Sequence, residues 1–144
     1  MPQDTRTPGI LRHLGAMLYD LLVVLALLMV ATTVVIVPMS LQGEDVSIGD
    51  NALFRLYLVV VGAAYYLWFW THGGQTVGMK TWRFRLTDEH GNTPGYAAAL
   101  RRLALAILLN MICLAGFLWR LVDPGKRTLY DRLSGTWLRE LPKS

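Results

Sequence analysis

Three long uncharged stretches dominate the pattern of hydrophobic and polar positions along this chain. Residues 21–37 contain no charged side chain, and together with residues 14–18, which precede Asp20, they form an apolar stretch of about 24 residues. Residues 56–70 form a second uncharged stretch, and residues 103–119 form a third. Because a helix needs about 20 apolar residues to cross the hydrocarbon core of a bilayer, the pattern predicts an integral membrane protein.

Two other interpretations of these stretches fit the sequence less well. Buried helices of a soluble protein would carry a polar residue at every third or fourth position, whereas the stretches offer only Thr32, Thr33 and Asn110. A cleaved signal peptide has an apolar core of about 7–15 residues, which is shorter than the first stretch, and further stretches follow here.

The composition agrees with a membrane protein. The chain of 144 residues is long enough for one domain, and 53% of its residues are hydrophobic while 17% are charged. Cys113 is the only cysteine, so one chain cannot form a disulfide framework or a zinc cluster, and we expect no metal and no cofactor. The formal charge of +4 arises from basic residues beside the apolar stretches, which indicates membrane topology rather than a nucleic-acid partner.

The distribution of lysine and arginine predicts the orientation in the membrane, because basic residues near span ends favour the cytoplasmic side. The segment before Leu14 carries Arg6 and Arg12, whereas the loop at residues 38–51 has no basic residue and carries three acids, Glu44, Asp45 and Asp50. Five basic residues follow the second stretch: Lys80, Arg83, Arg85, Arg101 and Arg102. We therefore expect a multi-pass protein of the bacterial inner membrane with a cytoplasmic N-terminus.

The third stretch conflicts with this rule if it crosses the membrane once. Six basic residues follow it, and a single crossing would place all of them outside: Arg120, Lys126, Arg127, Arg132, Arg139 and Lys143. Asn110 near the middle and Gly116 near the end would allow a break in the helix. The charge pattern favours a segment that enters the membrane and returns on the same side, with a single span as the alternative.

Two short alternating segments predict a β-ribbon. In the sequence TWRFRLTDEHGN, Trp82, Phe84 and Leu86 share one face, and the turn residues at 90–92 end the strand. GTWLREL near the end of the chain is a weaker candidate, with Trp137 and Leu141 on one face. Pairing of these strands would require a cytoplasmic C-terminus.

The glycine-rich sequence HGGQTVGMK, residues 72–80, resembles a phosphate-binding loop at first sight. Gly73 and Gly78 have the required spacing, but Met79 occupies the position of the lysine, and an aromatic, uncharged run precedes the loop. A backbone role fits better, since glycine permits positive φ and Gln75 and Thr76 can bond free backbone groups at the end of the second span. The alternative is lipid-headgroup binding through Lys80, Arg83 and Arg85.

An ordered set of residues resembles the RDD family of prokaryotic membrane proteins, which is named for an arginine and two aspartates. The resemblance extends from about Arg12 to Leu138 and includes Asp20, the sequence GQTVGMK at residues 74–80, a strand ending in Asp88 before a glycine, and LYDRLSGT at residues 129–136. It implies that Arg12, Asp20 and Asp131 are the three family residues. It also implies that the family's glycine motif falls on Gly74, Gln75, Thr76 and Gly78, with Lys80 as the nearest basic residue.

The chain departs from the family pattern at Met79 and at Tyr130, where a histidine is expected before the last aspartate. A role that needs an imidazole at Tyr130 is therefore in doubt. The resemblance implies a membrane protein for which transport is the usual suggestion, and it implies no known enzyme.

Asp20 is the most informative single residue, because it lies about 9 Å along the first helix from Leu14. A carboxylate at that depth marks either a cation or proton site or a structural ion pair. Arg101 and Arg102 are the expected partners. His13 lies seven residues before Asp20 on nearly the same helical face, so a water-mediated relay between them is an alternative to a solvated histidine.

Asp131 lies in a short segment where Leu129 and Leu133 would share the apolar face of an interfacial helix. Its carboxylate would turn inward toward Arg12 or Arg101, or form a salt bridge with Arg127 four residues earlier.

The sequence thus predicts an all-α membrane protein with a small cytoplasmic two-stranded ribbon, in a single domain over residues 1–144. The parts are a first span (12–37), a second span (53–71), a cytoplasmic glycine-rich turn and strand (72–100), a third apolar segment (101–121), and a cytoplasmic tail with a short helix and strand (122–144).

Three functions remain open for such a protein: transport of an ion or small solute, a scaffold role without transport, and lipid binding. No nucleophile–base pair supports an enzyme. Since one copy has too few helices to enclose a pathway, we expect membrane lipids and either a homo-oligomer or a partner membrane subunit.

Overall fold

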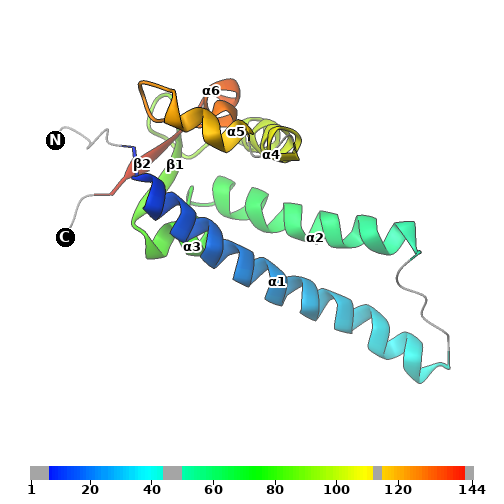
Figure 1. Ribbon diagram of the computed structural model, residues 1–144. Helices are drawn as coiled ribbons and strands as arrows, with labels where there is room; N and C mark the ends of the chain where they lie inside the picture. The colour runs from blue at the N-terminus through cyan, green and yellow to red at the C-terminus, as the bar shows by residue number, and fades with distance from the viewer. Residues whose placement is uncertain (1–6, 44–49, 112–114, 142–144) are drawn as a thin grey trace.

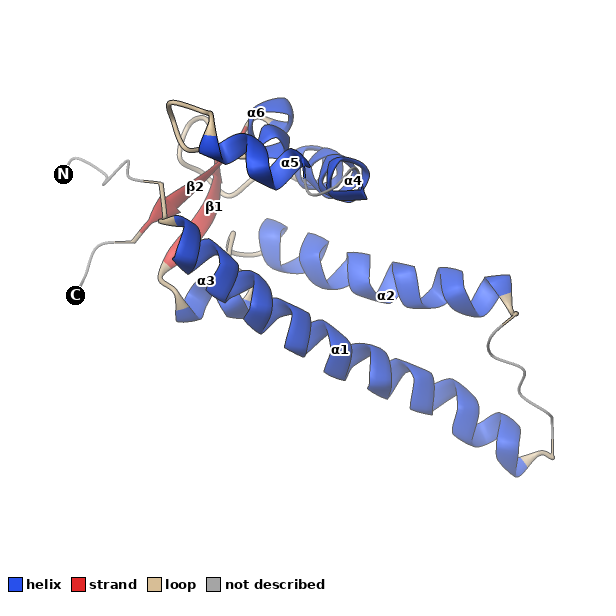
Figure 2. Cartoon of the chain, viewed as in Figure 1, coloured by secondary structure: helices blue, strands red, loops and turns tan. Residues whose placement is uncertain are grey.

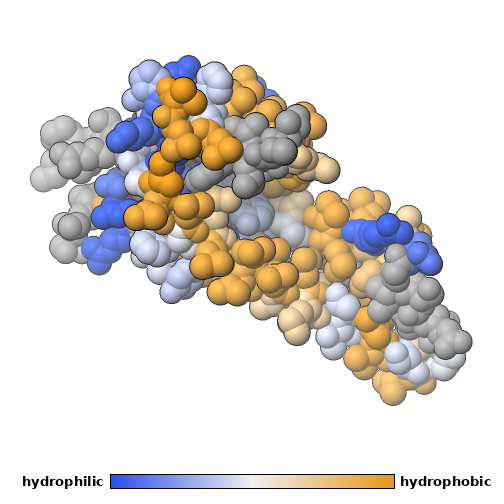
Figure 3. Space-filling view, viewed as in Figure 1, coloured by the Kyte–Doolittle hydropathy of each residue, from blue (hydrophilic) through white to orange (hydrophobic). Residues whose placement is uncertain are grey.

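Two long helices form a hairpin that dominates the molecule (Figure 1). The computed structural model describes residues 7–43, 50–111 and 115–141. Helix α1 spans Ile10–Leu41 and helix α2 spans Ala52–Thr71, and the two run side by side in opposite directions. Both are long and apolar enough to cross a membrane. Figure 3 shows apolar side chains over much of their visible surface, as lipid contact would require.

Helix α1 extends beyond the span predicted at residues 12–37. At 1.5 Å per residue its 32 residues measure about 48 Å, which exceeds a hydrocarbon core of about 30 Å. Pro38, expected to open the loop, lies inside the last turn. The proline ring removes the N–H that would bond to the carbonyl of Val34, and the helix ends soon after it at Gln42, whose N–H donates to the carbonyls of Pro38 and Met39.

A small cap covers the end of the hairpin where α1 begins and α2 ends (Figure 2). It contains helix α3 (Val77–Thr81), strand β1 (Phe84–Asp88), helix α6 (Leu129–Ser134) and strand β2 (Thr136–Glu140). The strands pair in antiparallel register, with Leu86 opposite Leu138. The predicted pairing of these two segments is confirmed.

The strands differ from the prediction in extent and in facing. Thr81 belongs to α3, and Arg83 has a φ of 55°, so the chain turns before β1 begins at Phe84. In β2 the core residue is Leu138 rather than Trp137, because Leu138 lies opposite Leu86 on the buried face. Trp137 instead packs under the Arg127 guanidinium, 3.7 Å from its ring centroid.

The described residues of the third apolar segment are helical. Helix α4 (Tyr96–Met111) begins earlier than predicted, directly after Pro94 and Gly95, and is followed by α5 (Ala115–Leu118) and a 3₁₀ turn, η1 (Trp119–Leu121). Figure 1 shows α4 nearly end-on, whereas α1 and α2 run across the view. Helix α4 packs against α2 and α6, and α5 packs back against α4.

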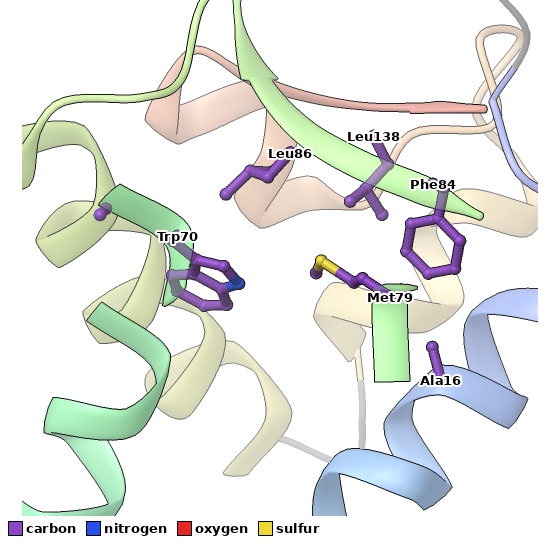
Figure 4. Packing of buried hydrophobic residues seen from close by; sticks show 7 residues of the cluster. Ala16, Trp70, Met79, Phe84, Leu86 and Leu138 are labelled. Atoms are coloured by element: carbon purple, nitrogen blue, oxygen red, sulfur yellow. The ribbon is translucent and has the colours of Figure 1, made fainter. Parts of the chain in front are cut away.

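Five residues that entered the sequence predictions lie outside the described residues: Arg6, Glu44, Asp45, Cys113 and Lys143. Within the described ranges, the buried apolar core lies between the cap and the adjacent turns of α1, α2 and α4 (Figure 4). It consists of Ala16, Trp70, Met79, Phe84, Leu86, Ala99 and Leu138. The cap is therefore fixed to the hairpin by apolar packing from every element that surrounds it.

Candidate functional site

The carboxylate of Asp20 is buried in α1, and three neutral groups donate hydrogen bonds to it. The Tyr65 hydroxyl and the Gly78 backbone N–H both bond to Oδ1 at 2.9 Å, and the Thr76 hydroxyl bonds to Oδ2 at 2.5 Å. These donors come from α2 and from the start of α3. One carboxylate thus joins three helices.

The glycine-rich motif brings the start of α3 close enough to α1 for these bonds. Thr76 is the N-cap of α3, and its hydroxyl accepts a bond from Met79 while donating to Asp20. A Cβ atom at Gly78 would overlap the carbonyl oxygen of Ala16, so only glycine permits this approach. Gly74 has a φ of 70°, and a Cβ atom added there would likewise overlap the carbonyl oxygen of Leu86.

The motif does bond to free backbone groups, as predicted, but these groups are not the ones at the end of α2. Gln75 donates to the carbonyl of Phe84 in β1, and Thr76 caps α3, so neither residue bonds to the end of α2. The sequence contains a strand and a short helix directly after the turn, and their free backbone groups are nearer than those of α2.

The predicted pairing of Asp20 with Arg101 or Arg102 is wrong. Within the described residues, neither arginine donates a hydrogen bond or forms a salt bridge to Asp20. Arg101 is exposed, and Arg102 bonds to another carboxylate. The donors of α3 already occupy Asp20, and they lie on the chain segment that packs directly on α1.

A cavity of about 470 Å³ opens beside Asp20 between α1, α2 and α4. Most of its wall is apolar, and the polar groups on it come from Asp20, Arg102, His13, Trp70 and two tyrosines, Tyr66 and Tyr130. The volume lies within the range of about 300–1,000 Å³ that small-molecule sites occupy. The site therefore combines a buried carboxylate with space for a ligand.

His13 is also buried and lies on the same face of α1 as Asp20 and Ala16. Its Nδ1 lies 2.7 Å from Nη1 of Arg120, and its ring meets Phe84 edge-on. Arg120 donates a second bond to the carbonyl of Pro8. The alternative of a solvated interfacial histidine is therefore wrong, because η1 and β1 cover this turn of α1.

The second aspartate, Asp131, forms a buried ion pair with Arg102 of α4. The same guanidinium nitrogen donates to the Thr136 hydroxyl at 2.9 Å. The guanidinium carbon lies 5.2 Å from the centroid of Trp70 and 5.0 Å from that of Tyr130. Arg102 thus connects α4 to α6, β2 and α2 through one charged group.

The other carboxylate oxygen of Asp131 closes a capping box at the start of α6. The Thr128 N–H donates to Oδ2 at 3.0 Å, and the Asp131 N–H donates to the Thr128 hydroxyl. Burial by itself raises the pKa of the Asp131 carboxyl, but the adjacent Arg102 guanidinium and the Thr128 hydrogen bond outweigh burial and hold the pKa below its ordinary value. Asp131 is therefore a structural anion rather than an exchangeable site.

The inward orientation expected for Asp131 agrees with the structure, but its partner is neither Arg12 nor Arg101. Arg12 is partly exposed and pairs with Glu140 of β2 at 2.9 Å. The alternative of a salt bridge to Arg127 is wrong as well, because that side chain donates to the backbone carbonyls of Asp131 and Thr136. Consecutive residues project about 100° apart on a helix, so Arg102 faces inward while Arg101 faces outward.

The three basic residues considered for lipid headgroups differ in exposure. Lys80 and Arg83 are exposed on the cap, whereas Arg85 is half-buried and donates to the carbonyl of Gly91. Lys80 does not complete a phosphate-binding loop, because it lies inside α3, after the buried Met79.

These networks also contain three residues that the sequence did not predict: Tyr65, Thr128 and Arg120. Thr128 carried a usable signal, since a threonine three residues before an acid is typical of a capping box. Tyr65 lies about 9 Å from the end of α2, a depth similar to that expected for Asp20, so antiparallel helices would bring the two together. Nothing in the sequence around Arg120 identified its contact with His13.

Comparison with known proteins gives one positive result. The sequence matches the model of the RDD family over residues 7–135. No curated protein and no solved structure matches it. The matched range includes Asp20, its three hydrogen-bond donors and the Arg102–Asp131 pair, and it ends one residue before Thr136.

Proposed function

The chain belongs to the RDD family, and from that premise we propose that it is an integral membrane protein that moves an ion or a small solute, with Asp20 as its binding group. The observation that carries the proposal is the contrast between its two buried aspartates. Asp131 is already paired with a guanidinium, whereas the described donors to Asp20 are neutral and its carboxylate lines a cavity. A buried carboxylate without a cationic side-chain partner is a candidate site for a transported cation or proton.

The hairpin of α1 and α2 cannot enclose a pathway by itself. Two candidate spans leave most of their surface apolar and exposed, so a continuous route through the membrane requires further helices. We therefore propose that transport takes place in a homo-oligomer or together with a partner subunit.

Asp20→Asn tests this function, because asparagine keeps the shape and one accepting oxygen of the side chain but removes its charge. In liposomes that carry a Na⁺, K⁺ or proton gradient, the wild-type protein is expected to dissipate at least one gradient and the variant none, while both remain folded. Asp50→Asn, at the exposed far end of the hairpin, is the matched control and should retain wild-type flux. Unchanged flux in Asp20→Asn would remove this carboxylate from transport.

We also propose that both chain termini lie on the cytoplasmic side of the bacterial inner membrane and that the third segment returns to that side. The β1–β2 pairing supports this, because β1 precedes the segment and β2 follows it. A green fluorescent protein fused after Ser144 should fluoresce in cells; an active alkaline phosphatase fusion at the same position would contradict the topology.

A scaffold role is the second candidate, and one observation favours it. The three bonds of Asp20 join α1, α2 and α3, so the carboxylate could serve assembly alone. In that case the wild-type protein would dissipate none of the three gradients, and Asp20→Asn would change only stability in detergent.

A further inference from the structure

We propose that the cavity between α1, α2 and α4 binds an uncharged lipophilic molecule that carries a carbonyl-type oxygen on an apolar body. The proposal goes beyond transport, because a protein that only assembles partners would contain the same site. Three features support it: the apolar wall, two buried donors without an acceptor, and an opening beside exposed apolar side chains.

Most of the apolar lining of the cavity comes from α4. Leu103, Ala106, Ile107 and Met111 line it, and Met17 of α1 contributes from the other side. A cavity of about 470 Å³ with this lining favours a ligand with an apolar body.

Two residues that line the cavity each carry a buried nitrogen donor without an acceptor among the described residues: Trp70 through Nε1 and Arg102 through Nε. Trp70 is 5% exposed and Arg102 is 2% exposed, so bulk water does not satisfy them. Figure 4 shows the indole nitrogen of Trp70 turned toward the space between Trp70 and Met79. Because an unsatisfied buried donor is costly, an accepting oxygen on the ligand is the missing partner.

The charges around the cavity select an uncharged acceptor. The Arg102 guanidinium already pairs with Asp131, and the Asp20 carboxylate on the same wall would repel a phosphate or a fatty-acid anion. A ketone, quinone or ester oxygen avoids this repulsion and can still accept from the Trp70 indole N–H.

The rim of the cavity carries exposed apolar side chains, as the surface of the hairpin does. Met111, Ile107 and Met17 line the cavity and are 80%, 50% and 38% exposed. Apolar side chains of α1 and α2 are exposed in the same manner, and lipid would cover them in a membrane. The ligand would therefore enter from the hydrocarbon phase rather than from water.

Photolabelling with benzophenone tests the site, because benzophenone is a lipophilic ketone that forms covalent adducts with nearby C–H bonds. The full-length protein is placed in nanodiscs of ether-linked phosphatidylcholine, which contain no ester carbonyl, and adducts are mapped by mass spectrometry. We expect saturable labelling at Met79 and in residues 103–111. 4-Octylacetophenone should compete, and octylbenzene, which lacks the oxygen, should not. Labelling that never saturates, or equal competition by octylbenzene, would overturn the proposal.

Two variants locate the interaction. Trp70→Phe keeps an aromatic ring but removes the N–H, and is expected to weaken benzophenone binding by about fivefold. Trp68→Phe is the matched control, because Trp68 lies on the same helix, is 59% exposed and does not line the cavity. Ala106→Phe should abolish labelling by filling the space. Unchanged affinity in Trp70→Phe, or full labelling in Ala106→Phe, would contradict the assignment.

A second set of nanodiscs, made of ester-linked phosphatidylcholine, identifies the natural source of the oxygen. Reduced labelling in ester lipid would indicate that the ester group of a bilayer lipid fills the site, and equal labelling would indicate a free lipophilic molecule. Either result supports the same recognition chemistry. Flux through Asp20 is measured separately, so a protein without transport activity could still pass this test.

Discussion

Asp131→Ala is expected to lower the free energy of unfolding by about 3–5 kcal/mol, the usual cost of breaking a buried ion pair by removing one partner. The side chains of Arg102 and Asp131 are 3% and 1% exposed, so the substitution leaves a guanidinium buried without its counter-charge. It also removes the Thr128 capping interaction. Thermal or SDS-induced unfolding in detergent, followed by circular dichroism, measures the loss.

Two further variants make this result specific. Glu140→Ala breaks the partly exposed pair with Arg12 and should cost about 1 kcal/mol or less. Replacement of both Arg102 and Asp131 by leucine should recover much of the lost stability, because an apolar pair leaves no buried charge. Equal losses for Asp131→Ala and Glu140→Ala would contradict a central role for the buried pair.

The spans and the ribbon were predictable because their signals are local. Uncharged length identifies α1 and α2 directly, since lipid selects for apolar side chains at every position of a span. The alternation around Phe84 and Leu86 identifies β1, and the basic tail indicates that the last strand returns to it. The buried face of β2 was mispredicted, because Trp137 is the larger apolar residue but Leu138 is the one opposite Leu86.

The partners of the aspartates were not predictable, because they depend on how distant segments pack. Thr76 and Gly78 lie 56 and 58 residues from Asp20 in sequence. Periodicity shows which residues share a face of one helix, but not which other element covers that face. Opposite charge therefore pointed to arginines as the partners of Asp20, whereas the packing interface supplies backbone and hydroxyl donors.

The charged residues of α4 show the same limit. Arg101 and Arg102 are adjacent and chemically identical, so sequence alone does not indicate which one faces the interior. The contact of α4 with α6 decides it, because it places Arg102 beside Asp131.

Gly78 carried a usable signal, since a glycine that begins a short helix often marks close approach of two backbones.

Asp20→Ala is expected to lower the free energy of unfolding by about 3 kcal/mol, because it leaves the Tyr65 hydroxyl, the Thr76 hydroxyl and the Gly78 N–H without their acceptor. A hydrogen bond to a charged group contributes about 1.5–3 kcal/mol, so Thr76→Val alone should cost about 2 kcal/mol. Unfolding in detergent again provides the measurement, with Thr81→Val as the control, because its hydroxyl bonds only within α3 and is exposed.

A double-mutant cycle between Asp20→Asn and Thr76→Val tests most directly whether neutral donors of α3, and not arginines, hold the Asp20 carboxylate. We predict a coupling free energy of about 1–2 kcal/mol between these two substitutions. A second cycle combines Asp20→Asn with replacement of the Arg102–Asp131 pair by leucines and should give a coupling near zero. No coupling to Thr76, together with strong coupling to the Arg102–Asp131 pair, would contradict the account.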